Sequence, residues 1–333
     1  MDGDDKMKRP PAWRMAVPYL IAGAILYWVF RDIDFREFLD ALWKGNLALV
    51  VTAMAGFTLV YSVCDITSYG LCYRWYVLPW IKVREMMNAR LGSYLLHVLY
   101  TPLSTVANLV YLRRHKGAPV WWALSANALT SVHDLFSINV LLTLALVLHV
   151  TVAPVKELSD LWLLPVSVPW LVALGYALYW FTPVRDMKIF RKVTTNPILR
   201  SCRFAKAHHY LVLLGSRLAV AFAGVAANAA LLYSFGIDAP LPMIIITGPL
   251  MIGTAFMPIS GGGFGGPQLV AQVLLPYAGG NEALVAAYSV AFSAGFTLGR
   301  SLVGIIFMPS YLKDIRTSGP LISVDPLTGE ALN

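Results

Sequence analysis

Three charged residues, Asp134, Arg217 and Arg300, lie inside segments that are otherwise apolar. Burying a charge within a bilayer costs about 3 kcal/mol or more, so such residues pair with one another or serve a transported species. We predict that Arg217 and Arg300 bind an anionic headgroup, with Asp134 as their counter-charge or as a proton carrier. The alternative is a structural ion pair that holds the fold together.

Two histidines lie near these charges in the sequence. His133 precedes Asp134 and, on a helix, points about 100° away from it. His97 lies in an apolar region of the first half of the chain. Because imidazole titrates near neutral pH, both are candidate proton relays. Asp65, in contrast, is expected to mark the boundary of its span.

A run rich in Gly and Pro, from Phe256 to Gln268, interrupts another apolar region. Broken backbone is tolerated at membrane depth where protein or a watery cavity satisfies it. Glycine lets N–H groups approach a phosphate, and a helix that starts near Pro267 adds positive charge. The run lacks the Lys-Ser/Thr of a nucleotide loop. We predict a substrate-facing loop at residues 261–263 (Gly261, Gly262, Gly263), with close helix packing as the alternative.

Neutral polar side chains accompany this run and a shorter break at residues 100–104 in the first half. Paired breaks in corresponding places point to the substrate site of a transporter. The polar residues are predicted to bind the headgroup, or else to satisfy the broken backbone: Ser104, Asn108, Ser260, Gln268 and Gln272.

The pair Asp32 and Asp34 is typical of the acidic loops with which membrane glycosyltransferases use polyprenyl-phosphate sugars. It supports the main enzymatic alternative, although acidic surface helices are common. Apart from this pair, no catalytic residue is predicted. The three cysteines, Cys64, Cys72 and Cys202, have no metal-ligand spacing, so neither a metal nor a cofactor is expected.

The elements that must position these residues are membrane helices. The chain is 58% hydrophobic and 13% charged, whereas soluble domains carry about 25% charged residues. Each of six segments is long enough to cross a bilayer. A net charge of +8 then reports topology and not nucleic-acid binding. Segment 31–45 is expected to be a surface helix and segment 66–88 to be interfacial. The predicted spans are 13–30, 46–65, 119–149, 162–182, 209–235 and 283–309.

Regions 89–112 and 240–278 are predicted to be re-entrant helical hairpins, broken at Pro102 and Pro258. With these hairpins, most of the 26 Lys and Arg residues lie on the same side of the membrane as both termini. Because cytosolic loops carry an excess of Lys and Arg, both termini are predicted to be cytosolic. The other side holds Arg31, Arg36, Lys44 and Lys156. The halves 46–149 and 209–309 have the same order of elements with opposite entry, which indicates an inverted repeat. Laying residues 130–135 over 296–301 puts Asp134 at the place of Arg300, so the two are expected to meet near the midplane.

Over residues 13–312 the chain resembles the flippase-like membrane domain of lysylphosphatidylglycerol synthases. The resemblance rests mainly on Leu250 to Gln268, with the core Pro-Ile-Ser-Gly-Gly-Gly-Phe-Gly. It departs from the family after Pro102, where Gly and Glu are common, and at Gln268, where Glu is common. The resemblance implies lipid translocation and not lysyl transfer. Its other matching residues are Arg113-Arg114, Gly117-Ala118-Pro119, Asp134 and Arg217.

The sequence therefore predicts an all-α polytopic membrane protein with about six spans and two re-entrant hairpins. Residues 1–12 and 313–333 are expected to be cytosolic tails of one domain in the bacterial cytoplasmic (inner) membrane. The expected function is to move a lipid with an anionic or phosphate-bearing headgroup between leaflets. The lipid itself stays open among phospholipid, polyprenyl-phosphate and glycolipid. The alternatives are a polyprenyl-phosphate-dependent glycosyltransferase and a non-catalytic partner of a lipid-modifying enzyme.

Overall fold

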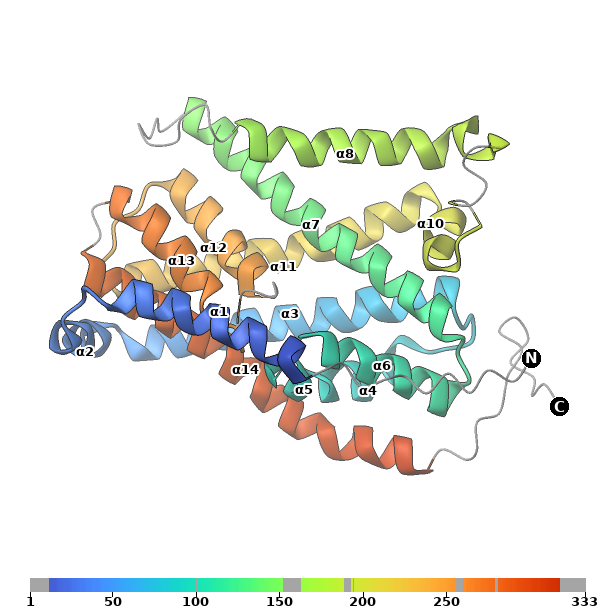
Figure 1. Ribbon diagram of the computed structural model, residues 1–333, viewed down its shortest axis with the longest axis horizontal. Helices are drawn as coiled ribbons and strands as arrows, with labels where there is room; N and C mark the ends of the chain where they lie inside the picture. Colours follow the sequence, from blue (N-terminus) through green and yellow to red (C-terminus); the bar gives the residue numbers. More distant parts are fainter. Residues whose placement is uncertain are drawn as a thin grey trace.

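The computed structural model is built of helices throughout the part of the chain that it describes (Figure 1). The described residues are 12–99, 101–151, 163–188, 193, 195–255, 260, 262–278 and 281–317. The expected all-α fold is therefore confirmed for these residues.

Within the described residues, four helices are long and apolar enough to cross a membrane: α3 (Leu47–Tyr76), α7 (Val120–Thr151), α11 (Ala207–Ser234) and α14 (Glu282–Thr317). They coincide with four of the six predicted spans, so the chain is a multi-pass membrane protein. Helices α3 and α11 pack against each other, and α7 packs against both. Helix α14 packs mainly against α3 and the short helices of the first half.

The other two predicted spans correspond to α1 (Ala12–Phe30) and α8 (Leu163–Phe181), whose described apolar parts are shorter. Helix α8 packs against the C-terminal part of α7, where the Trp170 indole N–H donates to the Thr143 hydroxyl at 2.8 Å (Figure 1). That α1 and α8 each cross the bilayer stays a prediction.

Helix α3 continues well past the predicted end of its span at residue 65. Its last three turns are helical to Tyr76, and they bury Tyr69, Tyr73 and Tyr76. The predicted end of the span at residue 65 is therefore wrong, whereas an interfacial position of segment 66–88 stays a prediction. The aromatic and polar residues of segment 66–76 belong to α3, and those on its buried face pack inside the protein. Asp65 lies well inside the same helix.

The first predicted hairpin consists of α4 (Met86–Gly92), α5 (Tyr94–Leu99) and α6 (Thr101–Lys116). Helices α5 and α6 pack against each other on either side of residue 100. The hydroxyl of Ser93, at the joint between α4 and α5, accepts hydrogen bonds at 3.0 Å from Ser104 Oγ and from Asn108 Nδ2. These bonds hold α6 against the start of α5.

The second predicted hairpin consists of α12 (Leu241–Ala255) and α13 (Gly266–Leu274), followed by the 3₁₀ turn η6 (Leu275–Ala278). The two helices pack against each other, and α12 also packs against α7. The predicted break at Pro258 falls in residues 256–259, outside the described part. Each region thus contains a pair of packed short helices, α5 with α6 and α12 with α13, and the re-entrant path of both stays a prediction.

The remaining elements are short. Helix α2 (Phe35–Lys44) is amphipathic and lies at one end of the molecule, whereas α10 (Arg200–Phe204) lies at the other (Figure 1). The single turns are η1 (Val83–Glu85), η3 (Pro183–Asp186) and η5 (Pro197–Leu199).

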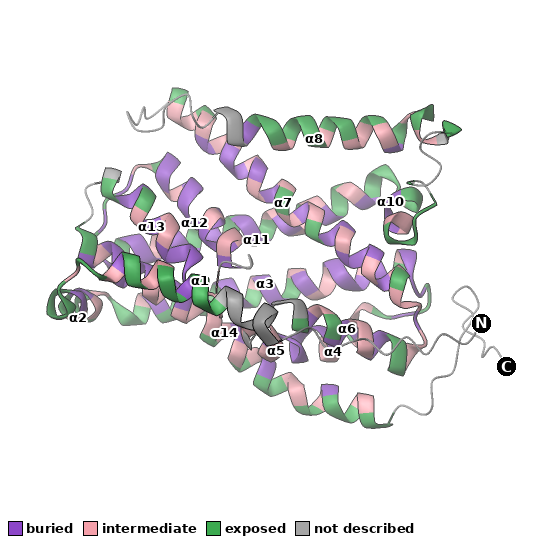
Figure 2. Ribbon diagram, viewed as in Figure 1, coloured by how far each residue is buried: buried purple, intermediate pink, exposed green. Residues whose placement is uncertain are grey.

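Large apolar side chains are exposed along the outer faces of the helices, while the middle of the bundle is buried (Figure 2). Leu59 of α3, Leu171 of α8 and Ile306 of α14 are examples, exposed at 67%, 66% and 69%. A soluble protein rarely exposes so much contiguous apolar surface. The outer surface therefore fits contact with lipid.

Candidate functional site

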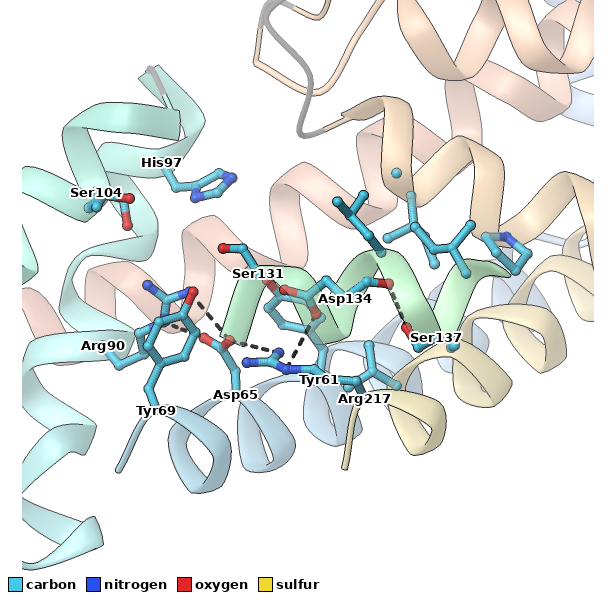
Figure 3. A pocket seen from close by; sticks show the side chains of 18 residues that line it. Tyr61, Asp65, Tyr69, Arg90, His97, Ser104, Ser131, Asp134, Ser137 and Arg217 are labelled. Carbon is cyan, nitrogen blue, oxygen red and sulfur yellow. Dashed lines mark hydrogen bonds and ion pairs between the residues drawn. The ribbon is translucent and has the colours of Figure 1, made fainter. Parts of the chain in front are cut away.

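A cavity of about 400 Å³ lies among the long helices and both helix pairs (Figure 3). Helices α3, α4, α5, α6, α7, α11 and α12 all contribute to its wall. Of the residues that the structure describes, four charged ones line it, two basic and two acidic: Asp65, Arg90, Asp134 and Arg217. Part of the remaining wall is apolar, formed by residues such as Leu135, Val220 and Ile252.

Asp65 is the most heavily bonded of these charges. Its Oδ2 accepts from Arg90 Nε at 2.6 Å and from the Tyr94 hydroxyl at 2.8 Å. Its Oδ1 accepts from Arg90 Nη2 at 3.3 Å and from Arg217 Nη1 at 3.2 Å. The Asp65 side chain is only 1% exposed. The expectation that Asp65 is a boundary residue is therefore wrong, because α3 extends beyond it and four donors surround it.

Arg217 of α11 joins the two carboxylates. Besides Asp65, its Nε lies 3.3 Å from Asp134 Oδ1, an ion pair without hydrogen-bond geometry. Among the described residues, neither Nε nor Nη2 of Arg217 has a hydrogen-bond acceptor, although the side chain is only 2% exposed. A buried guanidinium with unused donors can take an oxyanion, since guanidinium matches phosphate geometry.

Arg90 is the second cation of the cavity. The prediction of sidedness from the sequence placed it among the Lys and Arg residues that face the cytosol. Its guanidinium lies 3.7 Å from the centre of the Tyr69 ring, and that of Arg217 lies 5.3 Å from the same ring. The ring face thus lies against both cations, which favours holding two positive charges close together. Because Arg90 is buried against Asp65, it should not be counted among the surface charges that indicate which side of the membrane is cytosolic.

Asp134 of α7 faces the cavity from the middle of its helix, and 46% of its side chain is accessible (Figure 3). We expected Asp134 to meet Arg300, but it pairs with Arg217 instead. The reason is helix packing: α7 packs against α11, α12 and α3, whereas α14 packs mainly against α4, α5, α2 and α3. The alignment of the two halves, which puts Asp134 at the place of Arg300, therefore did not predict which helices pack together.

Arg300 of α14 is buried to 3% exposure and is not among the residues that line the cavity. Its guanidinium lies 5.0 Å from the centre of the Tyr94 ring, 5.4 Å from that of Tyr61 and 5.1 Å from that of Phe296. Tyr94 also donates to Asp65, so it connects Arg300 to the charged cluster. A headgroup role for Arg300 stays a prediction.

The histidines are placed differently from each other. His97 of α5 lines the cavity together with Ser104, Thr105 and Ser131. His133 does not line it: its Nδ1 lies 2.7 Å from the Leu129 carbonyl oxygen, and its ring packs 5.4 Å from that of Tyr210. The structure therefore brings His97 and Ser104 to the charged cluster but directs His133 elsewhere. Their proton-relay roles stay predictions.

The other predicted polar residues bond to backbone groups outside the cavity wall. Gln268 Nε2 donates to the Ser289 carbonyl at 3.2 Å, while its Oε1 accepts from Gly265 N at 2.7 Å. Ser260 Oγ donates to the Thr254 carbonyl at 2.7 Å. Asn108 Nδ2 also donates to the Ser104 carbonyl at 3.0 Å, and Gln272 Nε2 donates to the Glu282 carbonyl at 3.2 Å. These contacts favour the alternative in which they satisfy broken backbone.

The glycine run makes a tight turn before α13. Gly262 and Gly263 have φ of 61° and 91°, which favours glycine, and Gly262 O accepts from Thr297 Oγ1 at 2.9 Å. A Cβ on Gly262 would lie 3.3 Å from the Val98 carbonyl, so this turn reaches α5 of the first pair. The first N–H groups of α13 are occupied by side chains: Gly265 N by Gln268 and Gly266 N by Ser260. Gly261 lies outside the described residues.

The residues of the enzymatic alternative have structural partners. Asp34 caps α2 by accepting from Arg36 N at 2.7 Å, and the exposed Asp32 pairs with Arg31 at 2.8 Å. Burial raises the pKa of the Cys202 thiol, which makes it a poor nucleophile. Among the described residues, no group of three or more His, Cys, Asp or Glu could hold a metal ion.

Comparison with known proteins shows that this chain matches one protein family. Residues 15–304 match the family described as the lysylphosphatidylglycerol synthase TM region. The match covers the four long helices and both pairs of short helices, up to residue 304 of α14. No curated protein and no solved structure matches the chain.

Proposed function

The chain belongs to the lysylphosphatidylglycerol synthase TM-region family, and from this premise we propose that it moves lipids between membrane leaflets. Its substrate would carry an anionic or phosphate-bearing headgroup. The family supports a membrane role related to lipids, and the geometry of the cavity supports translocation.

One observation carries the proposal: Arg217 lines a cavity among the long helices, and two of its buried donor nitrogens have no hydrogen-bond acceptor among the described residues. Two carboxylates pair with this cation, and charges buried among membrane helices also mark substrate pathways. Asp65 holds Arg217 in place and is itself held by Arg90. The accessible Asp134 beside Arg217 can give up its place to a headgroup phosphate. The apolar part of the wall would border the acyl chains, which stay in the bilayer.

Movement across the membrane requires that the cavity open to each leaflet in turn. The two pairs of short helices both touch the cavity, through Ser104 and Thr105 on one side and Ile252 and Gly253 on the other. If they are re-entrant hairpins of an inverted repeat, each can gate one face, as in other transporters with this symmetry. We place the domain at residues 13–312 of a bacterial cytoplasmic membrane protein, with both termini cytosolic.

The test is lipid movement in proteoliposomes with a panel of fluorescent lipids whose outer-leaflet fraction is chemically quenched. Arg217→Gln should slow movement of anionic lipids at least tenfold, because the buried cation is lost. Arg84→Gln, which removes an exposed charge near the end of α3, is the matched control and should behave as the wild type. Thermal unfolding of each variant in detergent would show that it is folded.

Three outcomes distinguish the alternatives. Loss of headgroup-selective movement in folded Arg217→Gln supports the proposal. Absence of movement of any lipid by the wild type would contradict it. If Asp32→Asn and Asp34→Asn abolish transfer of a sugar from a polyprenyl phosphate, the glycosyltransferase alternative would replace it.

A further inference from the structure

We propose that Asp134 carries one proton across the membrane with each anionic headgroup, so that lipid movement is coupled to a proton gradient. This inference rests on the proposed function and adds its energy source. It comes from the unequal surroundings of the two carboxylates that share Arg217.

Asp65 and Asp134 differ in how firmly each is held as an anion. Asp65 accepts from Arg90 through two nitrogens, from Tyr94 and from Arg217, and it is sealed from solvent. Asp134 has the 3.3 Å ion pair with Arg217 Nε and keeps 46% of its side chain accessible. Hydrogen bonds to the charged form favour that form. Asp65 therefore stays ionised, whereas the charge of Asp134 depends on Arg217.

A headgroup phosphate that binds Arg217 competes with Asp134 for the same guanidinium. The unused Nη2 and the poorly oriented Nε are the donors it would take. Asp134 would then face a second anion in a confined space, and a like charge disfavours its ionised form. Because the cavity leaves Asp134 accessible, it can accept a proton from water on the open side.

The charges balance over one cycle. The phosphodiester brings one negative charge, and the proton bound to the Asp134 carboxyl brings one positive charge, so the loaded site has the same net charge as the empty one. When the headgroup leaves on the other side, Arg217 pairs again with Asp134, which releases the proton to water there. Proton and lipid thus move in the same direction without net charge transfer.

The groups that face Asp134 support this assignment. Arg217 of α11, Asp65, Tyr61 and Tyr69 of α3, Arg90 of α4 and His97 of α5 share its cavity. Helices α6 and α12 contribute Ser104, Thr105, Pro249, Ile252 and Gly253 there, none of which titrates near neutral pH. Contacts of α8 and α10 with α7 are made away from Asp134, at Thr143 and Ser125. His97 is therefore the rival proton carrier, and His133 bonds to Leu129.

The first experiment imposes a pH gradient on proteoliposomes, with the voltage clamped by potassium and valinomycin. The probes are fluorescent phosphatidylglycerol, which has one negative charge, and fluorescent phosphatidylcholine, which is neutral overall. With one proton per lipid, phosphatidylglycerol should accumulate about tenfold in the leaflet of the alkaline side for each pH unit. Phosphatidylcholine should distribute evenly.

Two substitutions identify the carrier. Asp134→Asn should abolish the uneven distribution, because an amide cannot carry the proton. His97→Gln alters the cavity wall and so the rate of movement, but the distribution reached at equilibrium should stay uneven. An even distribution of phosphatidylglycerol in the wild type would overturn the proposal, as would loss of the gradient response in His97→Gln but not in Asp134→Asn.

A binding experiment tests the inference even if no lipid moves. Dihexanoyl phosphatidylglycerol is added to the protein in weakly buffered detergent solution, and proton uptake is compared with lipid bound. The wild type and Asp40→Asn, an exposed carboxylate of α2, should take up about one proton per lipid; Asp134→Asn should take up none. Binding without proton uptake, or no binding at all, would contradict the coupling. Failure of movement with normal proton uptake would instead contradict the proposed translocation.

Discussion

Nη1 of Arg217 lies 3.2 Å from Oδ1 of Asp65, and this ion pair links the interiors of α3 and α11. Both side chains are almost completely buried. The same guanidinium reaches Asp134 on α7. Three of the four long helices are thus joined through one arginine, and the strength of each link can be tested separately.

Asp65→Asn should destabilise the protein much more than Asp134→Asn. Removing Asp65 leaves Arg90 and Arg217 buried without their shared anion, and breaking a buried pair costs about 3–5 kcal/mol. Asp134 is half accessible, so its pair contributes about 1 kcal/mol or less. Equilibrium unfolding in detergent measures both. Equal effects of the two substitutions would contradict the central role assigned to Asp65.

Gly299→Ala should destabilise the contact between α14 and α3. A Cβ at Gly299 would collide with Thr58 Oγ1, so the Thr58 side chain must turn or the helices must separate, at a cost of about 1–3 kcal/mol. Gly56 of α3 is the matched control, because no heavy atom lies within 4 Å of its Cβ position. Gly56→Ala should be neutral or stabilise by about 0.5–1 kcal/mol. The midpoint of thermal unfolding should therefore fall for Gly299→Ala and stay the same or rise for Gly56→Ala.

Gln268→Ala should lower stability without altering headgroup preference. The substitution removes bonds to Gly265 N, the Ser289 carbonyl and Ser293 Oγ, and a buried group left without a partner costs about 1–3 kcal/mol. Gln272→Ala, with one exposed bond to Glu282, should cost about 0.5 kcal/mol or less. If folded Gln268→Ala instead changes which lipids move, its side chain contacts substrate.

Cysteine labelling tests the predicted sidedness. In a variant whose three native cysteines are replaced by serine or alanine, Lys44→Cys in α2 should react with an impermeant maleimide on intact cells. Lys82→Cys, just before η1, should react only after the membrane is opened. Both native residues are exposed, so access is limited by the membrane alone. Labelling of Lys82→Cys in intact cells would overturn the assignment of both termini to the cytosol.

Much of the fold follows from local sequence. Long apolar segments predicted α3, α7, α11 and α14, because a helix that satisfies its own backbone is the way a single segment crosses lipid. Proline and glycine predicted the breaks near residue 100 and before α13, since these residues interrupt helical hydrogen bonding. The boundary of α3 was missed because polar and aromatic residues can line the buried face of a helix as well as an interface.

The partners of the charged residues did not follow from the sequence. Apolar surroundings indicated that Asp134, Arg217 and Arg300 are special, and Asp134 and Arg217 do lie together at the cavity. That Asp134 pairs with Arg217, that Asp65 accepts from Arg90 and that Arg300 lies against Tyr94 depend on which helices cross. The amino-acid sequence determined where a charge enters the membrane, because hydrophobicity is local. Only the tertiary structure decided what neutralises it, because an ion pair is set by distances between segments far apart in the chain.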